Sequence, residues 1–181
     1  MYNIHYQKFI EQDNKKNQIK THNISFRMMT IYDATAISQL LLNSPEVYIK
    51  YFSPFDFQVS SIQDILKKAV KDKFFGVDLK SEYSYESELV GFYMLRGLDE
   101  GYCHPMYGVF ISHQYSGKGI ASLTIRHAEL FCKVCNYEQL LLKVHSKNLR
   151  ARKLYESVGF KFLREENLIN NLVLYKKIQE I

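Results

Sequence analysis

The sequence contains no tryptophan, only three prolines and only three cysteines among its 181 residues. Cys103, Cys132 and Cys135 are odd in number and lack a framework spacing, so we expect buried free thiols and no disulfides. A zinc site would need more ligands than one Cys-x-x-Cys pair supplies, and we expect no metal. No apolar run approaches the roughly 20 residues that span a bilayer, and the first 22 residues are too polar for a secretory signal. These absences predict a cytoplasmic protein with no membrane partner.

Excess charge of either sign is also small, since the net charge is +5 and the basic residues are spread along the chain. This balance suits a polyanionic small molecule as well as nucleic acid. Without a basic stripe we expect no nucleic-acid partner. With 46% hydrophobic and 24% charged residues, the chain is large enough for one core of ordinary size. We therefore predict one domain over residues 24–181 after a polar N-terminal arm, 1–23.

Hydrophobic periodicity predicts strands and helices in mixed order. We expect strands over 24–29, 74–79, 89–95, 106–111, 139–145, 160–164 and 172–178, and helices over 31–43, 60–72, 120–135 and 149–158. Ser60 or Ser61 is the expected cap of the second helix, and the Asn-rich turn 167–171 joins the last two strands. Tyr and Phe crowd the irregular stretch 48–57, which we call the aromatic segment. This order predicts an α/β or α+β domain whose single mixed sheet carries helices on both faces.

Residues 117–121, Gly-Lys-Gly-Ile-Ala, stand between an apolar strand and an amphipathic helix, and we call them the glycine loop. The first N–H groups of a helix have no partner within it, and the helix dipole adds partial positive charge there. Glycines at 117 and 119 let phosphate oxygens approach the backbone. The loop is therefore a candidate anion site, although the same glycines could simply form a tight turn.

Two other phosphate loops fit the glycine loop poorly. A P-loop would need a Gly-Lys-Ser/Thr sequence that is not present here. A dinucleotide fingerprint would need an acidic residue at the end of the following strand. That strand ends at His145, and Glu138 lies at its other end.

The glycine loop belongs to a longer stretch, V-F-I-S-H-Q-Y-S-G-K-G-I-A over 109–121, and N-L-R-A-R-K-L-Y-E-S-V-G-F follows over 148–160. Together they resemble the GNAT superfamily of acetyl-CoA-dependent N-acetyltransferases. The family pattern is Gln/Arg-x-x-Gly-x-Gly/Ala, then Asn-x-x-Ala-x-x-x-Tyr-x-x-x-Gly-Phe. The first motif departs at His113, where proline is usual, and at Ser116, where Arg or Gln is common. The second is complete, with Asn148, Ala151, Tyr155, Gly159 and Phe160.

The resemblance implies a GNAT-like fold, with a mostly antiparallel sheet in which the parallel strands 106–111 and 139–145 splay apart. Acetyl-CoA would bind in that cleft as the cosubstrate. Its pyrophosphate would lie on the N–H groups of the glycine loop, and its pantetheine amides would pair with Val109 and Ile111. A backbone N–H would hold the oxyanion of the tetrahedral intermediate.

The resemblance also implies that Tyr155 protonates the leaving thiolate as a general acid and that Asn148 binds or orients the cofactor arm. The implied cofactor-binding residues are Val109, Phe110, Ile111, Ser116, Gly117, Lys118, Gly119, Ile120, Ala121, Asn148 and Tyr155. Asn148 could also serve only as a helix N-cap, and Tyr155 could be a core residue on the apolar face of its helix. Their joint occurrence at the family spacing favours the site.

An alkyl ammonium acceptor must lose a proton before it attacks. Asp99, Glu100 and His104 are the candidate bases, and His145 has a weaker claim. The stretch 94–102 is similar to GNAT-like proteins of surface-polysaccharide pathways, which implies a nucleotide-linked amino sugar as the small-molecule amine acceptor. The aromatic segment could stack on such a ligand or form a hydrophobic lid. The alternatives are a protein or peptide amine acetyltransferase and a catalytically silent CoA-binding sensor. The family also leaves a homodimer open.

Overall fold

The computed structural model describes residues 4–13, 18–81, 86–166 and 170–178. Its strands are β1 (Ile4–Asp13), β2 (Gln18–Met28), β3 (Lys73–Ser81), β4 (Ser87–Arg96), β5 (Met106–Ile111), β6 (Gln139–His145), β7 (Lys161–Glu166) and β8 (Asn171–Lys177). Its α-helices are α1 (Ala34–Leu42), α2 (Glu46–Ile49), α3 (Val59–Lys68), α4 (Ile120–Val134) and α5 (Leu149–Ser157), and two 3-10 turns are η1 (Ile31–Asp33) and η2 (His113–Tyr115).

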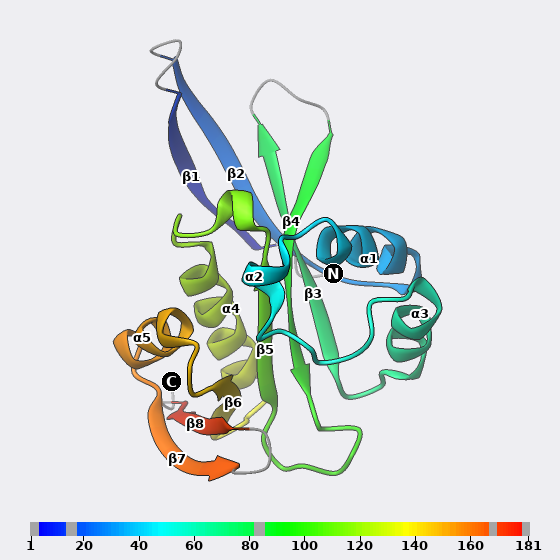
Figure 1. Cartoon of the computed structure of the whole chain (residues 1–181), viewed down its shortest axis with the longest axis vertical. Coiled ribbons are helices and arrows are strands. Elements are labelled where there is room, and N and C mark those ends of the chain that lie inside the picture. The colour runs from blue at the N-terminus through cyan, green and yellow to red at the C-terminus, as the bar shows by residue number, and fades with distance from the viewer. Residues whose placement is uncertain (1–3, 14–17, 82–85, 167–169, 179–181) are drawn as a thin grey trace.

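The strands form one sheet in the order β1-β2-β3-β4-β5-β6-β8-β7 (Figure 1). Among the described strands, β5 and β6 are the parallel neighbours, and the other pairs are antiparallel. The three strands expected between residues 74 and 111 are the antiparallel meander β3-β4-β5. The predicted class, an α/β or α+β domain with a mixed and mostly antiparallel sheet, is confirmed.

The parallel strands β5 and β6 separate soon after they begin. Their ladder consists of Met106↔Leu141 and Tyr107↔Leu142. Beyond this point β5 continues to Ile111 and β6 to His145, without further pairing between these described strands. The splayed pair that the resemblance implied is therefore present.

Alternate residues of the central strands supply two separate cores. Tyr93 and Tyr107 pack with α4 and α5 on one face, whereas Phe92 and Phe110 pack with α1 and α3 on the other (Figure 1). Successive strand side chains point to opposite faces, so the apolar runs of β4 and β5 produce a sheet buried on both sides. This arrangement confirms the prediction of helices on both faces.

The N-terminal region contains more strand than the sequence indicated. β1 and β2 pair antiparallel from Ile4↔Phe26 to Asp13↔Gln18, whereas the sequence analysis expected a polar arm up to residue 23 and a first strand from residue 24. The polar, Asn/Lys-rich composition concealed strands that pair along the edge of the sheet. The expected boundary at residue 24 falls inside β2, and its role as a domain boundary stays a prediction.

The helices lie close to their predicted positions, with one wrong cap. Helix α3 begins at Val59 with Gln58 as its N-cap, so Ser60 and Ser61 lie inside it. The Ser61 hydroxyl donates instead to the Asp56 carboxylate at 2.8 Å. The helix also ends at Lys68, earlier than expected, because Ala69 has an extended backbone. Part of the expected turn 167–171 lies outside the described residues.

The cysteines are free thiols, as expected, but their burial differs. Cys132 lies on α4 and is buried in the core, whereas Cys103 and Cys135 are exposed. The expectation of burial is therefore wrong for two of the three. None of the helices in the described part of the chain is long and apolar enough to cross a membrane.

Candidate active site

The glycine loop connects η2 to α4 at the carboxyl end of β5. Gly117 and Gly119 have φ values of +83° and +80°, which favour glycine. The N–H groups of Ser122 and Leu123 both donate to the Gly119 carbonyl, at 3.0 and 3.2 Å. The N–H groups before Ser122 therefore precede the first helical hydrogen bonds, where a helix has no acceptor of its own. A Cβ built on Gly119 would meet no atom within 4 Å, so the loop opens onto space that an anion can enter.

Arg150, near the start of α5, lies beside this loop. Its Nη2 atom is 3.3 Å from the position that a Cβ on Gly117 would occupy. A guanidinium and the amino end of α4 thus converge on one place, and both favour a phosphate group. Sequence reasoning missed Arg150 because the family pattern marks its neighbours Asn148 and Ala151. Lys118 places its ammonium group 5.2 Å from the centroid of the Tyr115 ring.

The free edge of β5 borders the splay between the parallel strands. The Ser112 N–H donates to the Val90 carbonyl at 2.8 Å, and Phe110 pairs with Phe92 in the same ladder. Because alternate residues of an antiparallel strand bond to the same partner, Val109 and Ile111 direct their N–H and C=O groups away from β4, toward β6. Their backbone groups therefore line the cleft that the resemblance assigns to the pantetheine arm. Phe110 instead directs its backbone groups to β4, and its ring lies in the core beneath α1 and α3.

The aromatic segment reaches both splayed strands. The Tyr48 hydroxyl donates to the Ile111 carbonyl at 2.8 Å and lies 3.1 Å from Ser116 Oγ. The Tyr51 ring stacks on His145, with the ring centroids 4.7 Å apart. Phe52 packs on Phe110, with centroids 5.2 Å apart. These contacts match the lid that the sequence analysis kept as one interpretation of the segment.

Helix α5 presents Asn148 and Tyr155. Asn148 is the N-cap, and its Oδ1 accepts the Ala151 N–H at 3.2 Å. Tyr155 is only 8% exposed and meets Phe160 edge to face, with ring centroids 5.8 Å apart. Burial raises the pKa of Tyr155 to about 12, because it disfavours the charged phenolate. At neutral pH the phenol therefore keeps its proton, the state that a general acid requires.

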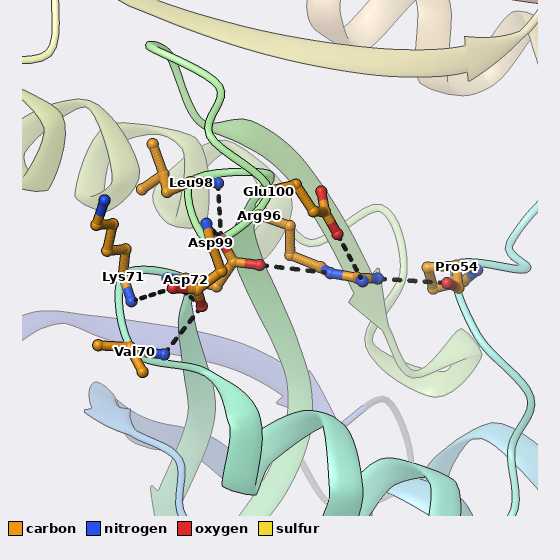
Figure 2. A network of polar contacts seen from close by, with 8 residues as sticks. All are labelled: Pro54, Val70, Lys71, Asp72, Arg96, Leu98, Asp99 and Glu100. Carbon is orange, nitrogen blue, oxygen red and sulfur yellow. Dashed lines mark hydrogen bonds and ion pairs between the residues drawn. The ribbon is translucent and has the colours of Figure 1, made fainter.

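The candidate base Asp99 belongs to a polar network that joins two turns (Figure 2). Its carboxylate accepts the backbone N–H groups of Lys71, Val70 and Asp72 at 2.8, 2.9 and 3.2 Å. These hydrogen bonds, led by that from Lys71, lower the pKa of Asp99. The Asp72 carboxylate in turn accepts the N–H groups of Leu98 and Asp99. The reciprocal contacts give Asp99 a clear structural role.

Glu100 belongs to the same network, and His104 follows in the chain just before β5 begins. Arg96 lies 4.0 Å from the Glu100 carboxylate and donates to the Pro54 carbonyl at 3.3 Å (Figure 2). His104 Nδ1 is buried and has no hydrogen-bond partner among the described residues.

The structure thus gathers the backbone of Val109 and Ile111, the glycine loop and Asn148 at the carboxyl end of β5 and the amino ends of α4 and α5. Tyr155 lies in the last turn of α5, and Phe110 faces the other core. Asp99, Glu100 and His104 precede the amino end of β5, a strand about 17 Å long. The weaker base candidate, His145, lies instead at the carboxyl end of β6. The general base stays a prediction. In the described residues, no group of three or more His, Cys, Asp or Glu side chains is arranged to hold a metal ion.

Comparison with known families agrees with this geometry. Residues 44–160 match the acetyltransferase (GNAT) family, which is more than half of the chain. The chain belongs to the GNAT family. The matched residues include the glycine loop, the splayed strands and α5. The family assignment therefore rests on the segments that form the candidate site.

Solved structures share the GNAT fold at low sequence identity. A domain from Methanocaldococcus jannaschii DSM 2661 has a TM-score of 0.73 and 18% identity, and the alignment covers 86% of this chain and 99% of that one. The spermidine N-acetyltransferase of Vibrio cholerae in complex with CoA and spermine has a TM-score of 0.67 and 21% identity, covering 86% and 95%. At these identities the likeness shows the fold.

N-acetylaspartate synthetase from Xenopus tropicalis is 33% identical over 76 residues, which are 42% of this chain. The aligned part spans 28% of that protein's length. The similarity therefore concerns a portion of each protein.

Proposed function

We propose that this GNAT protein transfers an acetyl group from acetyl-CoA to the primary amine of a small acceptor. The observation that carries the proposal is the open edge of β5, where Val109 and Ile111 lead directly to the positive-φ glycines of the glycine loop. A strand edge suits the amides of a pantetheine arm, and a helix start suits a pyrophosphate. The GNAT relative solved with CoA supports acetyl-CoA as the cosubstrate.

Binding would involve backbone groups first and side chains second. The N–H groups at the start of α4 would hold the pyrophosphate, and Arg150 adds a positive charge beside Gly117. Val109 and Ile111 would pair with the pantetheine amides. Ile120 and Ala121 would contribute through their backbone, since Ile120 buries its side chain in the core. Asn148, which caps α5, would orient the arm.

Tyr155 would act on the thiol side of the reaction. Its pKa of about 12 keeps the phenol protonated, so it can donate a proton to the departing thiolate. A backbone N–H of β5 would stabilise the oxyanion that forms as the amine attacks. An ordinary alkyl ammonium has a pKa near 10, so Asp99, Glu100, His104 or water must first accept its proton.

We favour a nucleotide-linked amino sugar as the acceptor, as in a polysaccharide pathway. Support comes from the half-buried rings of the aromatic segment, where Tyr51 could extend a stack toward a base or sugar ring. Amino sugars also have a lower amine pKa than alkyl amines, which reduces the need for a strong base. The names of the relatives add a polyamine and aspartate to the acceptors that merit a test.

The test combines binding and turnover. Acetyl-CoA is titrated into the protein by calorimetry, and thiol release is then followed with nucleotide-linked amino sugars, spermidine, aspartate and peptides. Binding together with acceptor-dependent release is the expected result, and the preferred amine names the acceptor class. Binding without release from any amine would indicate a CoA-binding sensor. Absence of binding would overturn the assignment of the glycine loop.

A further inference from the structure

The aromatic segment links the two strands that separate at the candidate site. Tyr48 contacts β5 through the Ile111 carbonyl, and Tyr51 contacts β6 through the ring of His145. The two tyrosines are three positions apart, at α2 and just after it. One short stretch of chain therefore contacts the carboxyl ends of both strands, where β5 and β6 no longer pair with each other.

The segment is itself held firmly against the sheet. Phe52 packs on Phe92 and Phe110, with centroids 6.0 and 5.2 Å apart. Beyond it, the Phe57 carbonyl accepts the Ser38 hydroxyl of α1 at 2.7 Å, and Arg96 of β4 donates to the Pro54 carbonyl. These contacts attach the segment to α1 and β4, so Tyr48 and Tyr51 connect the splayed strand ends to the rest of the fold.

Tyr48 also joins β5 to the glycine loop. Its hydroxyl lies between the Ile111 carbonyl and Ser116, the residue directly before Gly117. The Tyr48 ring meets Phe110 and His113 edge to face, with centroids 6.0 and 6.2 Å apart. One hydroxyl therefore contacts both the edge of β5 and the residue that precedes the glycine loop.

We propose that Tyr48 and Tyr51 are positioning residues that hold the acetyl-CoA cleft at its working width. Tyr48 fixes the glycine loop relative to the edge of β5, and Tyr51 fixes the end of β6. This inference rests on the proposed function. A carbonyl oxygen has two lone pairs, so the hydrogen bond from Tyr48 leaves Ile111 able to accept a second donor from the pantetheine arm.

The decisive variant is Tyr48→Phe, which removes the hydroxyl and keeps the ring packed on Phe110. We expect acetyl-CoA affinity, measured by calorimetry, to fall roughly three- to tenfold, the usual effect of one hydrogen bond. At saturating acetyl-CoA, kcat should stay within about twofold, because the reacting groups are not touched. The melting temperature should stay near that of the wild type.

Two further variants test whether the contacts act together. Ser116→Ala should cause a similar loss of affinity, and the double variant Tyr48→Phe/Ser116→Ala should bind no more weakly than the worse single variant. Tyr51→Leu removes the stack on His145 and should also weaken binding, with less than full additivity to Tyr48→Phe. Tyr32→Phe, at a tyrosine that is 88% exposed on η1, is the matched control and should bind as the wild type does.

The direction in which Tyr48→Phe changes acetyl-CoA affinity shows whether the Tyr48 hydroxyl positions the cleft or competes with the cofactor. If the hydroxyl competed with the cofactor for Ile111, the variant would bind acetyl-CoA more tightly, and the proposal would be overturned. Unchanged affinity, or full additivity with Ser116→Ala, would overturn it as well. If the wild type itself does not bind acetyl-CoA, the proposed function fails before the variants are compared.

Discussion

At the scale of single residues, Tyr155 carries the proton in the proposed reaction. Tyr155→Phe keeps the edge-to-face contact with Phe160 and removes the acid. We expect kcat to fall by roughly 10²- to 10⁴-fold, the usual size of general-acid effects, with acetyl-CoA affinity within about twofold of the wild type. Steady-state kinetics and calorimetry measure the two quantities. Because the pKa is about 12, the wild-type rate should show no alkaline decline from this group in ordinary buffers. Unchanged kcat in the variant would show that Tyr155 is a core residue and not the general acid.

Asp99 shows how a candidate base can be told from a structural carboxylate. It accepts three backbone N–H groups, from residues 70–72, so Asp99→Ala leaves those donors without their partner. We expect a lower melting temperature for Asp99→Ala, measured by scanning calorimetry. Glu100→Gln, at the neighbouring exposed carboxylate that lies 4.0 Å from Arg96, is the control and should melt as the wild type does. A loss of kcat in Asp99→Ala with unchanged melting would instead identify Asp99 as the base.

At the scale of elements, the glycine loop offers a matched pair of variants. Gly119 and Gly101 both have φ near +90°, and a Cβ on either meets no atom within 4 Å. Each change to alanine should cost about 1 kcal/mol of stability, because alanine disfavours this conformation. Gly119→Ala should also weaken acetyl-CoA binding at least tenfold, because its Cβ projects into the open space of the loop. Urea denaturation and calorimetry check both results, and equal binding by the two variants would contradict the assigned loop.

The sequence predicted those elements whose signals come from neighbouring residues, and it missed features that depend on residues far apart in the chain. The glycine loop, α4, β6 and α5 were predicted closely, because glycine placement and apolar periodicity act over a few neighbouring residues. β1 was missed, because its polar sequence is a strand only through pairing with β2. The contact of Tyr48 with Ile111 was also missed, since it joins positions 63 apart. The approach of Arg150 to Gly117 was missed for the same reason, since the two positions are far apart in the sequence.

At the scale of the whole molecule, the sheet separates two hydrophobic cores that support different parts of the candidate site. The core beneath α4 and α5 contains Tyr155 and supports the cofactor side, whereas the core beneath α1 and α3 anchors the aromatic segment. The cleft opens where β5 and β6 part, so both cores must be intact for its edges to keep their positions. Site geometry and global stability are therefore linked in this fold, and a buried residue in the middle of α4 provides a direct test of that stability.

His127 of α4 is that residue. It is buried, stacks on Phe26 with centroids 4.5 Å apart, and shares a hydrogen bond with the Tyr93 hydroxyl. Burial lowers its pKa from 6.5 to about 4, so the folded state holds His127 neutral where the unfolded chain would already bind a proton. The stability that it contributes is complete above about pH 6.5 and is lost as the pH falls toward 4, by about 3 kcal/mol in all.

Urea denaturation at several pH values between about 7 and 4 measures this loss. Carboxylates that titrate in the same range contribute equally to the wild type and to the variant described next. The double variant Tyr93→Phe/His127→Leu removes both partners of the buried hydrogen bond and leaves no unpaired polar group. Its stability should fall less steeply with acid than that of the wild type. If the stabilities of the wild type and the double variant fall in parallel with pH, protonation of His127 is not what destabilises the folded protein in acid.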